Sequence, residues 1–474
     1  MDTRTIKNYA YNLSYQILLV LAPLITTPYV SRVLQADGVG TYSYTQGIAA
    51  AFTLFAALGA NIYGQREVAC KQDDVEARSR LFWELFFFRL LTTFAVVMAY
   101  LVFCFLYDDY RVYLLINTMI IVSTALDLSW FFQGMEDFKA VAIRNVIIKI
   151  FTIVGIFLFV KNYEDLWVYV LINAISGVVG GLALFPSLRK VVAKVDFSTI
   201  HIGRHLKGCL EFFVPLVATQ IYSQLDTVML GAILNDPFEN GYYSQSRKII
   251  QILLLVATSL NTVMMSRVSK LCADRDFSKA KETMSESFKV ILLVTTPLMV
   301  GTLLVSDNLT DWFFGPGYEK VAFLIKLSVP LLFLMAIGNF VGNQYLIPTN
   351  QQNTMTKIYI MAAIVNVALN SVMILLFASV GAMLASIAAE AVSCGLQVAL
   401  LIRSSYSFNM LEGSWRYAIS ALVMGFAIVI VQISFGLTGV TETCLELGTG
   451  VLVYSVSLLA FKDPMALALL RRLR

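Results

Sequence analysis

Charged side chains are scarce in this sequence. Only 14% of its 474 residues are Asp, Glu, Lys or Arg, whereas 58% are hydrophobic and the mean hydropathy is +0.73. Soluble domains carry roughly a quarter charged residues, so a large soluble protein with an apolar interior is excluded. Apolar runs of about 20 residues, the length of a membrane-spanning helix, recur along the whole chain. The composition therefore predicts an all-α integral membrane protein.

Histidine and cysteine are also scarce, and this argues against enzyme chemistry. The two histidines, His201 and His205, lie in one basic stretch that has neither an HExxH motif nor carboxylates to complete a metal site. The six cysteines show no CxxC or metal-ligand spacing, and no phosphate-binding Gly-Lys-Ser/Thr loop is present. We therefore expect no enzyme activity, no cofactor and no metal, and the net charge of +4 gives no reason to expect a nucleic-acid partner.

Hydropathy predicts about fourteen membrane spans. The first six lie near 10–31, 39–63, 81–106, 111–133, 143–160 and 166–188. The next six lie near 211–234, 242–265, 286–305, 322–347, 357–377 and 380–402, and two more lie near 416–437 and 443–461.

The distribution of Lys and Arg predicts the orientation of these spans. With the N-terminus inside, the predicted cytoplasmic segments hold 25 of the 35 basic residues. The predicted outer segments hold only Arg32, Arg111, Lys161 and Lys320. An even number of spans then places both termini in the cytoplasm. The longest predicted outer connection is Ser306–Lys320.

A weak internal repeat predicts two related halves. Pro23 and Pro215 lie in similar apolar segments, and Gly40 and Gly241 each precede a Tyr- and Ser-containing segment. The offsets are 215 − 23 = 192 and 241 − 40 = 201 residues. We predict two pseudo-symmetric six-helix lobes, residues 1–200 and 201–405, followed by two accessory helices and a basic tail in 406–474.

Polar residues follow helical spacing within several predicted spans, which places them on one face of each helix. The four stripes are Asn8, Asn12, Tyr15, Leu19, Ala22 and Thr26; Glu211, Pro215, Thr219, Tyr222 and Asp226; Ser244, Arg247, Gln251, Leu255, Thr258 and Thr262; and Ser386, Glu390, Ser393 and Gln397. The pattern is typical of helices around a hydrated cavity. It is also typical of hydrogen bonds between helices in a sealed bundle, and the sequence leaves both open.

Ionisable residues within spans are costly, so they are the first candidates for a functional site. They are Arg89, Asp127, Lys149, Asp226, Arg247, Lys248 and Glu390, and Arg32 lies at the end of the first span. Arg89, Arg247 and Lys248 could instead reach the membrane surface, because they lie near span ends. Lys149 and Asp226 are harder to explain in that way.

The sequence resembles the polysaccharide or O-antigen flippases of the Wzx type, which share a superfamily with multidrug and toxin extruders and lipid II flippases. The resemblance covers nearly the whole chain. It is carried by the stretches from Lys7-Asn8 to Arg32-Val33-Leu34, Gly38–Ser43, Gly64–Ala69, Leu128–Glu136, Gln224–Gly231 and Gly241–Tyr243. These motifs are typical of the family and identify the type of transporter better than its cargo.

The resemblance implies two lobes facing each other across a central cavity that opens alternately to each side of the bacterial inner membrane. It implies an undecaprenyl-pyrophosphate-linked oligosaccharide as cargo, with a polysaccharide polymerase and a chain-length regulator as partners. A pyrophosphate needs fixed positive charge. The available cations are Arg32, Arg89, Lys149, Arg247 and Lys248. Asp127, Asp226 and Glu390 could balance these cations or carry a coupling proton or sodium ion.

Two other functions compete with this hypothesis. A multidrug or cation antiporter of the same fold would carry cationic cargo in a cavity dominated by acids, whereas basic residues slightly outnumber acids in these spans. A polytopic polysaccharide polymerase or glycosyltransferase would need a large outer domain or loop with catalytic residues, and none is present in the sequence.

Overall fold

A computed structural model describes the backbone of residues 3–467 except 190, 194, 197, 199, 260, 411 and 437. The side chains of residues 3–17, 19, 20, 218, 219, 221–224, 262 and 263 also lie outside the description. Several members of the predicted polar stripes therefore lie outside the described residues, namely Asn8, Asn12, Tyr15, Leu19, Thr219, Tyr222 and Thr262. Throughout the described part the chain is helical and contains no strand, which agrees with the predicted all-α class.

The chain divides into two compact units, Met1–Gly231 and Ala232–Arg474. The sequence repeat predicts a division after residue 200, so the first unit also contains most of the first helix of the second predicted lobe. The proposal that two six-helix lobes superpose stays a prediction.

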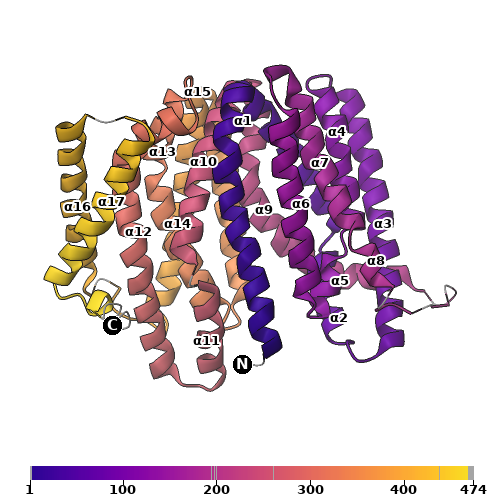
Figure 1. Ribbon diagram of the computed structural model, residues 1–474. Helices are drawn as coiled ribbons and strands as arrows, with labels where there is room; N and C mark the ends of the chain where they lie inside the picture. Colours follow the sequence, from indigo (N-terminus) through magenta and orange to yellow (C-terminus); the bar gives the residue numbers. More distant parts are fainter. Residues whose placement is uncertain are drawn as a thin grey trace. The chain divides into compact units, whose positions relative to one another are not determined.

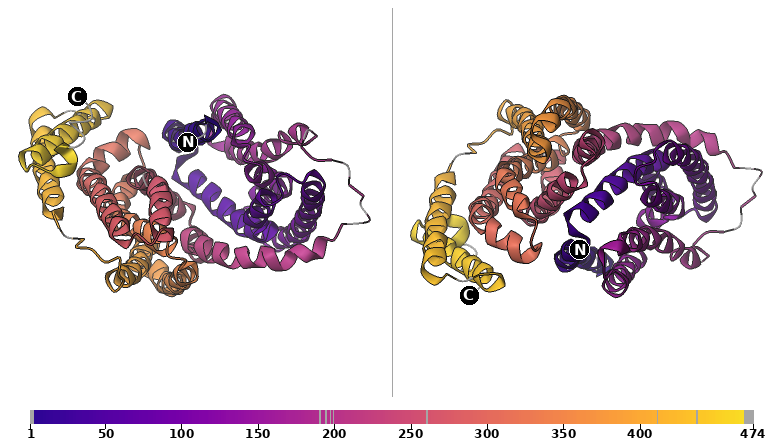
Figure 2. Two further views of the ribbon diagram at one scale, coloured as in Figure 1. Left: turned by 90° about the horizontal axis from the view of Figure 1, so that it is seen from below. Right: turned by 90° about the horizontal axis from the view of Figure 1, so that it is seen from above.

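The first unit is built from long helices joined by short ones (Figures 1 and 2). In chain order they are α1 (Thr3–Ala57), α2 (Ala60–Ala69), α3 (Val75–Leu106), α4 (Arg111–Leu126), α5 (Ser129–Gly134), α6 (Phe138–Phe159), η1 (Tyr163–Asp165), α7 (Leu166–Leu182), α8 (Phe185–Leu188), η3 (Ile202–His205) and α9 (Leu206–Leu234). The short helices α2, α5 and α8 lie at one end of the unit, the lower end in Figure 1.

The second unit is also built from long helices joined by short ones. Its helices are α10 (Pro237–Thr258), α11 (Asn261–Ala273), α12 (Phe277–Phe313), α13 (Glu319–Leu327), α14 (Val329–Val341), η4 (Gly342–Leu346), α15 (Gln352–Ile402), α16 (Ser414–Phe435) and α17 (Val440–Ala460). The last two helices pack on α12, where the Asn308 side chain donates to Thr443 Oγ1 at 2.8 Å. Buried apolar residues of α12, α14, α16 and α17 form one core cluster.

Nine helices in the described part are long and apolar enough to cross a membrane, and a tenth span is the bent pair Leu21–Ala57 and Ala60–Ala69. Each of the fourteen predicted spans falls on helical segments, because α1 and α15 each cover two of them. The chain is therefore a multi-pass membrane protein. The number fourteen stays a prediction.

The helices labelled α1 and α15 each consist of two helices that meet at a sharp kink, and each of the two parts corresponds to a predicted span. Within α1 the break is at Gln35, with φ 56°, and within α15 it is at Ala378, with φ 53°. Both kinks fall between the predicted spans, Gln35 between 10–31 and 39–63 and Ala378 between 357–377 and 380–402. A difference lies in the predicted outer connection Ser306–Lys320, where α12 continues to Phe313 before Pro316 and Gly317 form the turn.

The two units share local features at similar spacing. Asp74 Oδ1 caps the start of α3 by accepting from Ala77 N at 3.0 Å, and Asp276 Oδ1 caps α12 by accepting from Lys279 N at 3.2 Å. The separation of these caps is 276 − 74 = 202 residues, close to the offset of 201 in the sequence repeat.

In each unit, a carboxylate near the start of a helical segment also accepts a hydrogen bond from a residue between two predicted spans. These are the fifth and sixth predicted spans of the corresponding half of the sequence. Tyr163 Oη in η1 donates to Asp37 Oδ2 at 2.6 Å, and Ser379 N beside the break in α15 donates to Glu239 Oε2 at 3.0 Å.

Helix α9 packs along the second part of α1 and along α2 within the first unit. A Cβ atom added to Gly59 would lie 2.3 Å from Cys209 O, and one added to Gly208 would lie 2.3 Å from the Tyr63 ring. The Phe55 and Phe213 rings are 5.5 Å apart. These close approaches explain why α9 up to Gly231 belongs to the first compact unit.

Candidate functional site

Arg89 on α3 is the most deeply buried of the predicted site residues, with 1% of its surface exposed. Its guanidinium donates to the backbone oxygens of Asp127, at 2.7 Å, and Thr124 at the end of α4. The last carbonyls of a helix have no partner within the helix, so the arginine satisfies them where α4 stops before α5. The guanidinium also lies 5.8 Å from the centre of the Trp130 ring.

The carboxyl of Asp127 lies at the same break between α4 and α5. It accepts from Ser129 N at 3.1 Å and lies 3.5 Å from the guanidinium of Arg144 on α6. Arg144 donates in turn to Gly180 O at 2.8 Å. The structure thus brings Arg89 and Asp127 together in one network of hydrogen bonds and an ion pair. This network joins α3, the end of α4, α6 and α7.

The other predicted site residues of the first unit lie apart from this network. Arg32 is exposed on α1 and donates to Pro28 O at 3.3 Å, one turn earlier in the same helix. Asp226 is buried in α9, with 3% of its surface exposed. Lys149 is half-buried on α6, and its ammonium has no hydrogen bond or ion pair with the described part of the chain.

In the second unit, Arg247 and Lys248 are both half-buried on α10. Lys248 Nζ donates to Gln245 Oε1 at 2.9 Å. The guanidinium of Arg247 has no hydrogen-bond or ion-pair partner among the residues that the structure describes. Asp226 belongs to the first unit and Arg247 to the second, so the predicted coupling between them stays a prediction.

Glu390 is buried on α15, with 6% of its surface exposed, and faces the small residues of α14. A Cβ atom added to Gly338 would lie 3.3 Å from Glu390 Oε1, and one added to Gly342 would lie 3.6 Å from Gln397 Oε1. Gln397 donates to Ser393 Oγ at 3.1 Å, one turn earlier on the same face. The Gly-x-x-x-Gly pair thus lets α14 approach a polar stripe, and no basic side chain in the described residues pairs with Glu390.

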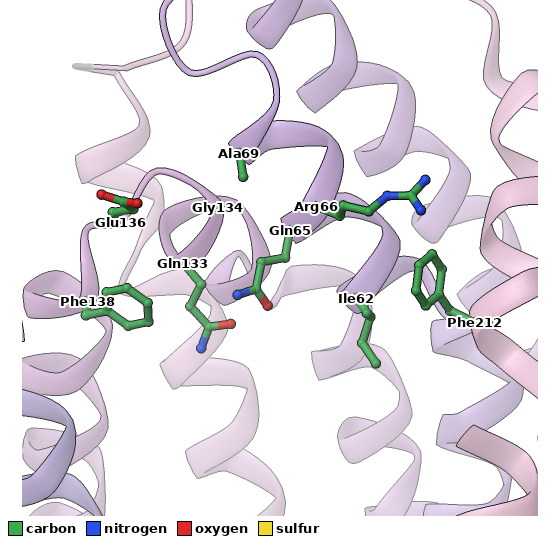
Figure 3. A pocket seen from close by; sticks show the side chains of 9 residues that line it. All are labelled: Ile62, Gln65, Arg66, Ala69, Gln133, Gly134, Glu136, Phe138 and Phe212. Atoms are coloured by element: carbon green, nitrogen blue, oxygen red, sulfur yellow. The ribbon is translucent and has the colours of Figure 1, made fainter. Parts of the chain in front are cut away.

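A cavity of about 620 Å³ lies at the end of the first unit where α2 and α5 meet. Figure 3 shows its lining, which comes from α2, the α5–α6 segment and α9: Ile62, Gln65, Arg66, Ala69, Gln133, Gly134, Glu136, Phe138 and Phe212. The amides of Gln65 and Gln133 lie centrally in this view, with Phe138 on one side and Phe212 on the other.

Two glycines allow the helices at this cavity to approach so closely. A Cβ atom on Gly64 would lie 2.5 Å from the Trp130 ring, and one on Gly134 would lie 2.7 Å from Gln65 O. The Gln72 amide also donates to Gly134 O at 2.6 Å, which ties the end of α5 to the segment after α2. The helices α2 and α5 that line the cavity are therefore packed in direct contact.

Opposite charges lie at the rim of the cavity. Arg66 is exposed, and its guanidinium lies 3.1 Å from Glu67 Oε1 and 5.1 Å from the centre of the Phe212 ring. Glu136 is exposed at the turn after α5, where its φ is 57°. Arg66 points towards Phe212 and away from Gln133 in Figure 3.

Sequence reasoning did not select any residue of this cavity as a site. In the sequence, the segments Gly64–Ala69 and Leu128–Glu136 stand out only as motifs of the resembled family. Arg66 stands out only as a basic residue of a predicted cytoplasmic segment. The signal that could have found the cavity is the polar content of these two motifs, because both lie at span ends that the orientation rule places on the same side of the membrane.

Two family profiles match the chain. The family described as "Polysaccharide biosynthesis protein" matches residues 5–272, and the family described as MatE matches residues 213–372. The first match covers more than half of the chain.

Similar proteins of known name span most of the chain. The "Putative O-antigen transporter" of Escherichia coli (strain K12) is 22% identical over 80% of this chain and 92% of its own length. The "Probable low-salt glycan biosynthesis flippase Agl15" of Haloferax volcanii is 22% identical over 76% of this chain and 75% of its own length. The solved structure of "Lipid II flippase MurJ, inward closed conformation" superposes with a TM-score of 0.76 at 18% identity, covering 97% of this chain and 100% of that one. This last likeness is one of fold.

Proposed function

The chain belongs to the polysaccharide biosynthesis protein family, and from this premise we propose that it is a flippase for a lipid-linked oligosaccharide. Its family and its fold are those of membrane transporters rather than enzymes. The proposed cargo is an undecaprenyl-pyrophosphate-linked repeat unit of an O-antigen or capsule. The proposed step carries it from the cytoplasmic to the outer leaflet of a bacterial inner membrane by alternating access, with both termini in the cytoplasm.

One observation supports an anionic cargo above the others. Arg247 on α10 and Lys149 on α6 lie in predicted membrane spans, and neither has a hydrogen bond or ion pair with a described residue. An unpaired cation in a membrane span costs several kcal/mol by some scales, so such residues usually serve an ion or substrate pathway. A pyrophosphate would supply the missing partner, and a guanidinium can bind it through two parallel hydrogen bonds.

The proposed roles of the eight candidate residues now differ. Lys149, Arg247 and Lys248 are the proposed cargo-binding cations. Arg89 is already bonded to carbonyls, and Arg32 lies exposed near a helix break, so their binding roles rest on the sequence alone. Asp226 and Glu390 are the proposed charge-balancing or ion-coupling groups, and Asp127 shares this role only in part because Ser129 and Arg144 contact it.

The test uses a strain whose own copy of the gene is deleted. The Arg247→Gln, Lys248→Gln double variant, present in the membrane at the native level, is expected to abolish surface polysaccharide and to let the lipid-linked repeat unit accumulate inside. Arg247→Lys should restore export only in part, because it keeps the charge and loses the two-point geometry. Normal surface polysaccharide in the double variant would remove this site from consideration.

A multidrug or cation antiporter is the second candidate, favoured by two specific observations. The MatE profile covers residues 213–372, and the buried Glu390 has no basic partner in the described chain. Such a transporter would protect cells from cationic dyes, and Glu390→Gln would abolish that protection. The flippase proposal expects no dye resistance from wild type or variant. It expects Glu390→Gln to change at most the dependence of export on a proton or sodium gradient.

The polysaccharide polymerase and chain-length regulator are proposed partners on the outer side. They would consume the flipped repeat unit there, so a strain lacking the polymerase should still display single repeat units if this chain is active.

A further inference from the structure

The cavity between α2 and α5 contains two amide side chains that make no hydrogen bond with the described part of the protein. Gln65 and Gln133 are half-buried, and neither side chain has a hydrogen-bond partner among the described residues. Each amide offers two N–H donors and one carbonyl acceptor. Two such groups directed into one cavity match a ligand that carries several hydroxyl groups, because a hydroxyl both donates and accepts.

The walls beside the amides are apolar. Phe138 and Phe212 lie on either side of them, and Ile62 lies between Gln65 and Phe212 in Figure 3. A sugar ring has C–H groups on its faces and hydroxyls around its edge, so it can pack on an aromatic ring while its edge bonds to amides. A hydrocarbon chain would offer no hydrogen bond to either amide and would displace the water that reaches them, which costs free energy.

The charges argue against a phosphate in the same cavity. Arg66 is the one cation among the described residues that line the cavity; it is ion-paired with Glu67 and packs beside Phe212, and Glu136 adds an acid at the rim. A pyrophosphate carries negative charge and would meet no surplus of positive charge here. The volume of about 620 Å³ falls within the range of about 300–1,000 Å³ that small-molecule sites occupy, and it suits a mono- or disaccharide.

We propose that this cavity is a sugar-binding site in which Gln65 and Gln133 hold the glycan of the cargo. The inference rests on the proposed function, and it assigns recognition of the sugar to a place distinct from the cations of α6 and α10. By the predicted orientation the cavity lies at the cytoplasmic side, where the lipid-linked glycan is made. The close packing of α2 against α5 keeps the backbone that carries the two amides in place before the glycan arrives, which reduces the entropy lost on binding.

The experiment measures sugar binding without the pyrophosphate. The probe is the reducing oligosaccharide released by mild acid from the host's own lipid-linked repeat unit, offered to the full chain in nanodiscs and detected by saturation-transfer NMR. Wild type is expected to bind it, and Gln65→Ala, Gln133→Ala is expected to bind about tenfold more weakly through the loss of two hydrogen bonds. Gln352→Ala, which removes an exposed amide at the start of α15, is the matched control and should bind like wild type.

Two further variants separate this inference from the proposed function. Arg247→Gln should lose export and keep sugar binding, because the probe lacks the group that Arg247 is proposed to bind. Gln133→Glu, which keeps the size of the side chain and loses its donors, checks that weaker binding is not caused by misfolding.

Each outcome decides the matter. Equal binding by wild type and the double amide variant would overturn the sugar site while leaving the flippase proposal intact. The absence of any binding by wild type would also overturn it. Loss of binding in both Arg247→Gln and the amide variant would place the glycan at the cations instead. A strain that exports normally without the gene would overturn the proposed function itself.

Discussion

Arg89 donates hydrogen bonds to the backbone at the break between α4 and α5, and replacing its guanidinium tests whether its role is structural. Arg89→Lys keeps the charge but replaces two guanidinium nitrogens by one ammonium, which loses the fixed geometry of the two hydrogen bonds to the oxygens of Asp127 and Thr124. Leaving one buried carbonyl without its charged donor is expected to cost about 2–3 kcal/mol of stability. Thermal unfolding of the purified protein measures this loss.

The alternative role of Arg89 predicts a different result. If Arg89 binds cargo, Arg89→Lys should unfold at the wild-type temperature and still fail to export polysaccharide. The described contacts favour the structural role, since both hydrogen bonds end on backbone of the first unit itself.

His205 gives the protein a dependence on acid. Its imidazole Nε2 is hydrogen-bonded to Glu84 Oε2 at 2.9 Å, and its Nδ1 is hydrogen-bonded to Tyr63 Oη at 3.0 Å. Burial lowers the pKa of the imidazole, although the hydrogen bond to Glu84 partly opposes this. The unfolded chain therefore takes up the proton first as pH falls below about 6.5. Stability should be complete above that pH and should decrease as the pH drops through the folded pKa.

The comparison of the two histidines provides the control for this prediction. His205→Gln cannot titrate, so its unfolding temperature between pH 8 and pH 5 should change less than that of wild type. His201→Gln removes an exposed ring but keeps the backbone N–H that donates to Glu84 at 3.1 Å, so it should keep the wild-type profile. Equal pH profiles for wild type and His205→Gln would contradict the argument.

Single residues show where sequence reasoning reached its limit. Spacing and hydropathy identified Arg89, Lys149 and Arg247 alike as charges within spans. They did not separate an arginine that caps a broken helix from cations without a described partner. That distinction depends on where a carbonyl of another helix loses its own hydrogen bond, and the break after Leu126 carries no proline or glycine to announce it.

At the scale of elements, the contact between α2 and α5 depends on Gly134. An alanine there would place Cβ 2.7 Å from Gln65 O, an atom of the backbone that cannot move aside easily. Gly134→Ala is expected to cost about 1–3 kcal/mol of stability, measured by thermal unfolding. It should also weaken the proposed sugar site, because the helix that carries Gln65 must shift.

Gly395 on α15 is the matched glycine. A Cβ atom there would meet nothing within 4 Å, so Gly395→Ala should be neutral or raise the stability by about 0.5–1 kcal/mol. Equal unfolding temperatures for the two alanine variants would show that α2 and α5 are not held by close packing.

Helix type and rough extent followed from the sequence, while the breaks within predicted spans did not. Hydropathy reports where a helix can lie in lipid, so the spans of α3, α6, α16 and α17 were located to within a few residues at most ends. The kinks at Gln35 and Ala378 lie between predicted spans, whereas the break between α4 and α5 lies inside the predicted span 111–133. The short helices α2, α5 and α11 are too polar or too brief to stand out as spans of their own.

For the whole molecule, the predicted topology has a direct test. A phosphatase fused after the last residue should be inactive and one inserted at Gly315, in the turn between α12 and α13, should be active, because the basic residues place these points on opposite sides. Green fluorescent protein at the same two points should give the reverse pattern. Phosphatase activity at the C-terminus would sink the fourteen-span arrangement.

The packing of α9 on α1 and α2 has a consequence for expressing the protein as two separate pieces. A cut between Asn235 and Asp236 keeps α9 covalently joined to the helices on which it packs, whereas a cut between residues 200 and 201 removes it together with the residues that bind Glu84. Co-expressed pieces 1–235 and 236–474 should therefore complement each other in a deletion strain, and pieces 1–200 and 201–474 should do so more weakly. The place where the chain tolerates division would then lie about 35 residues beyond the boundary that the sequence repeat predicts, since 235 − 200 = 35.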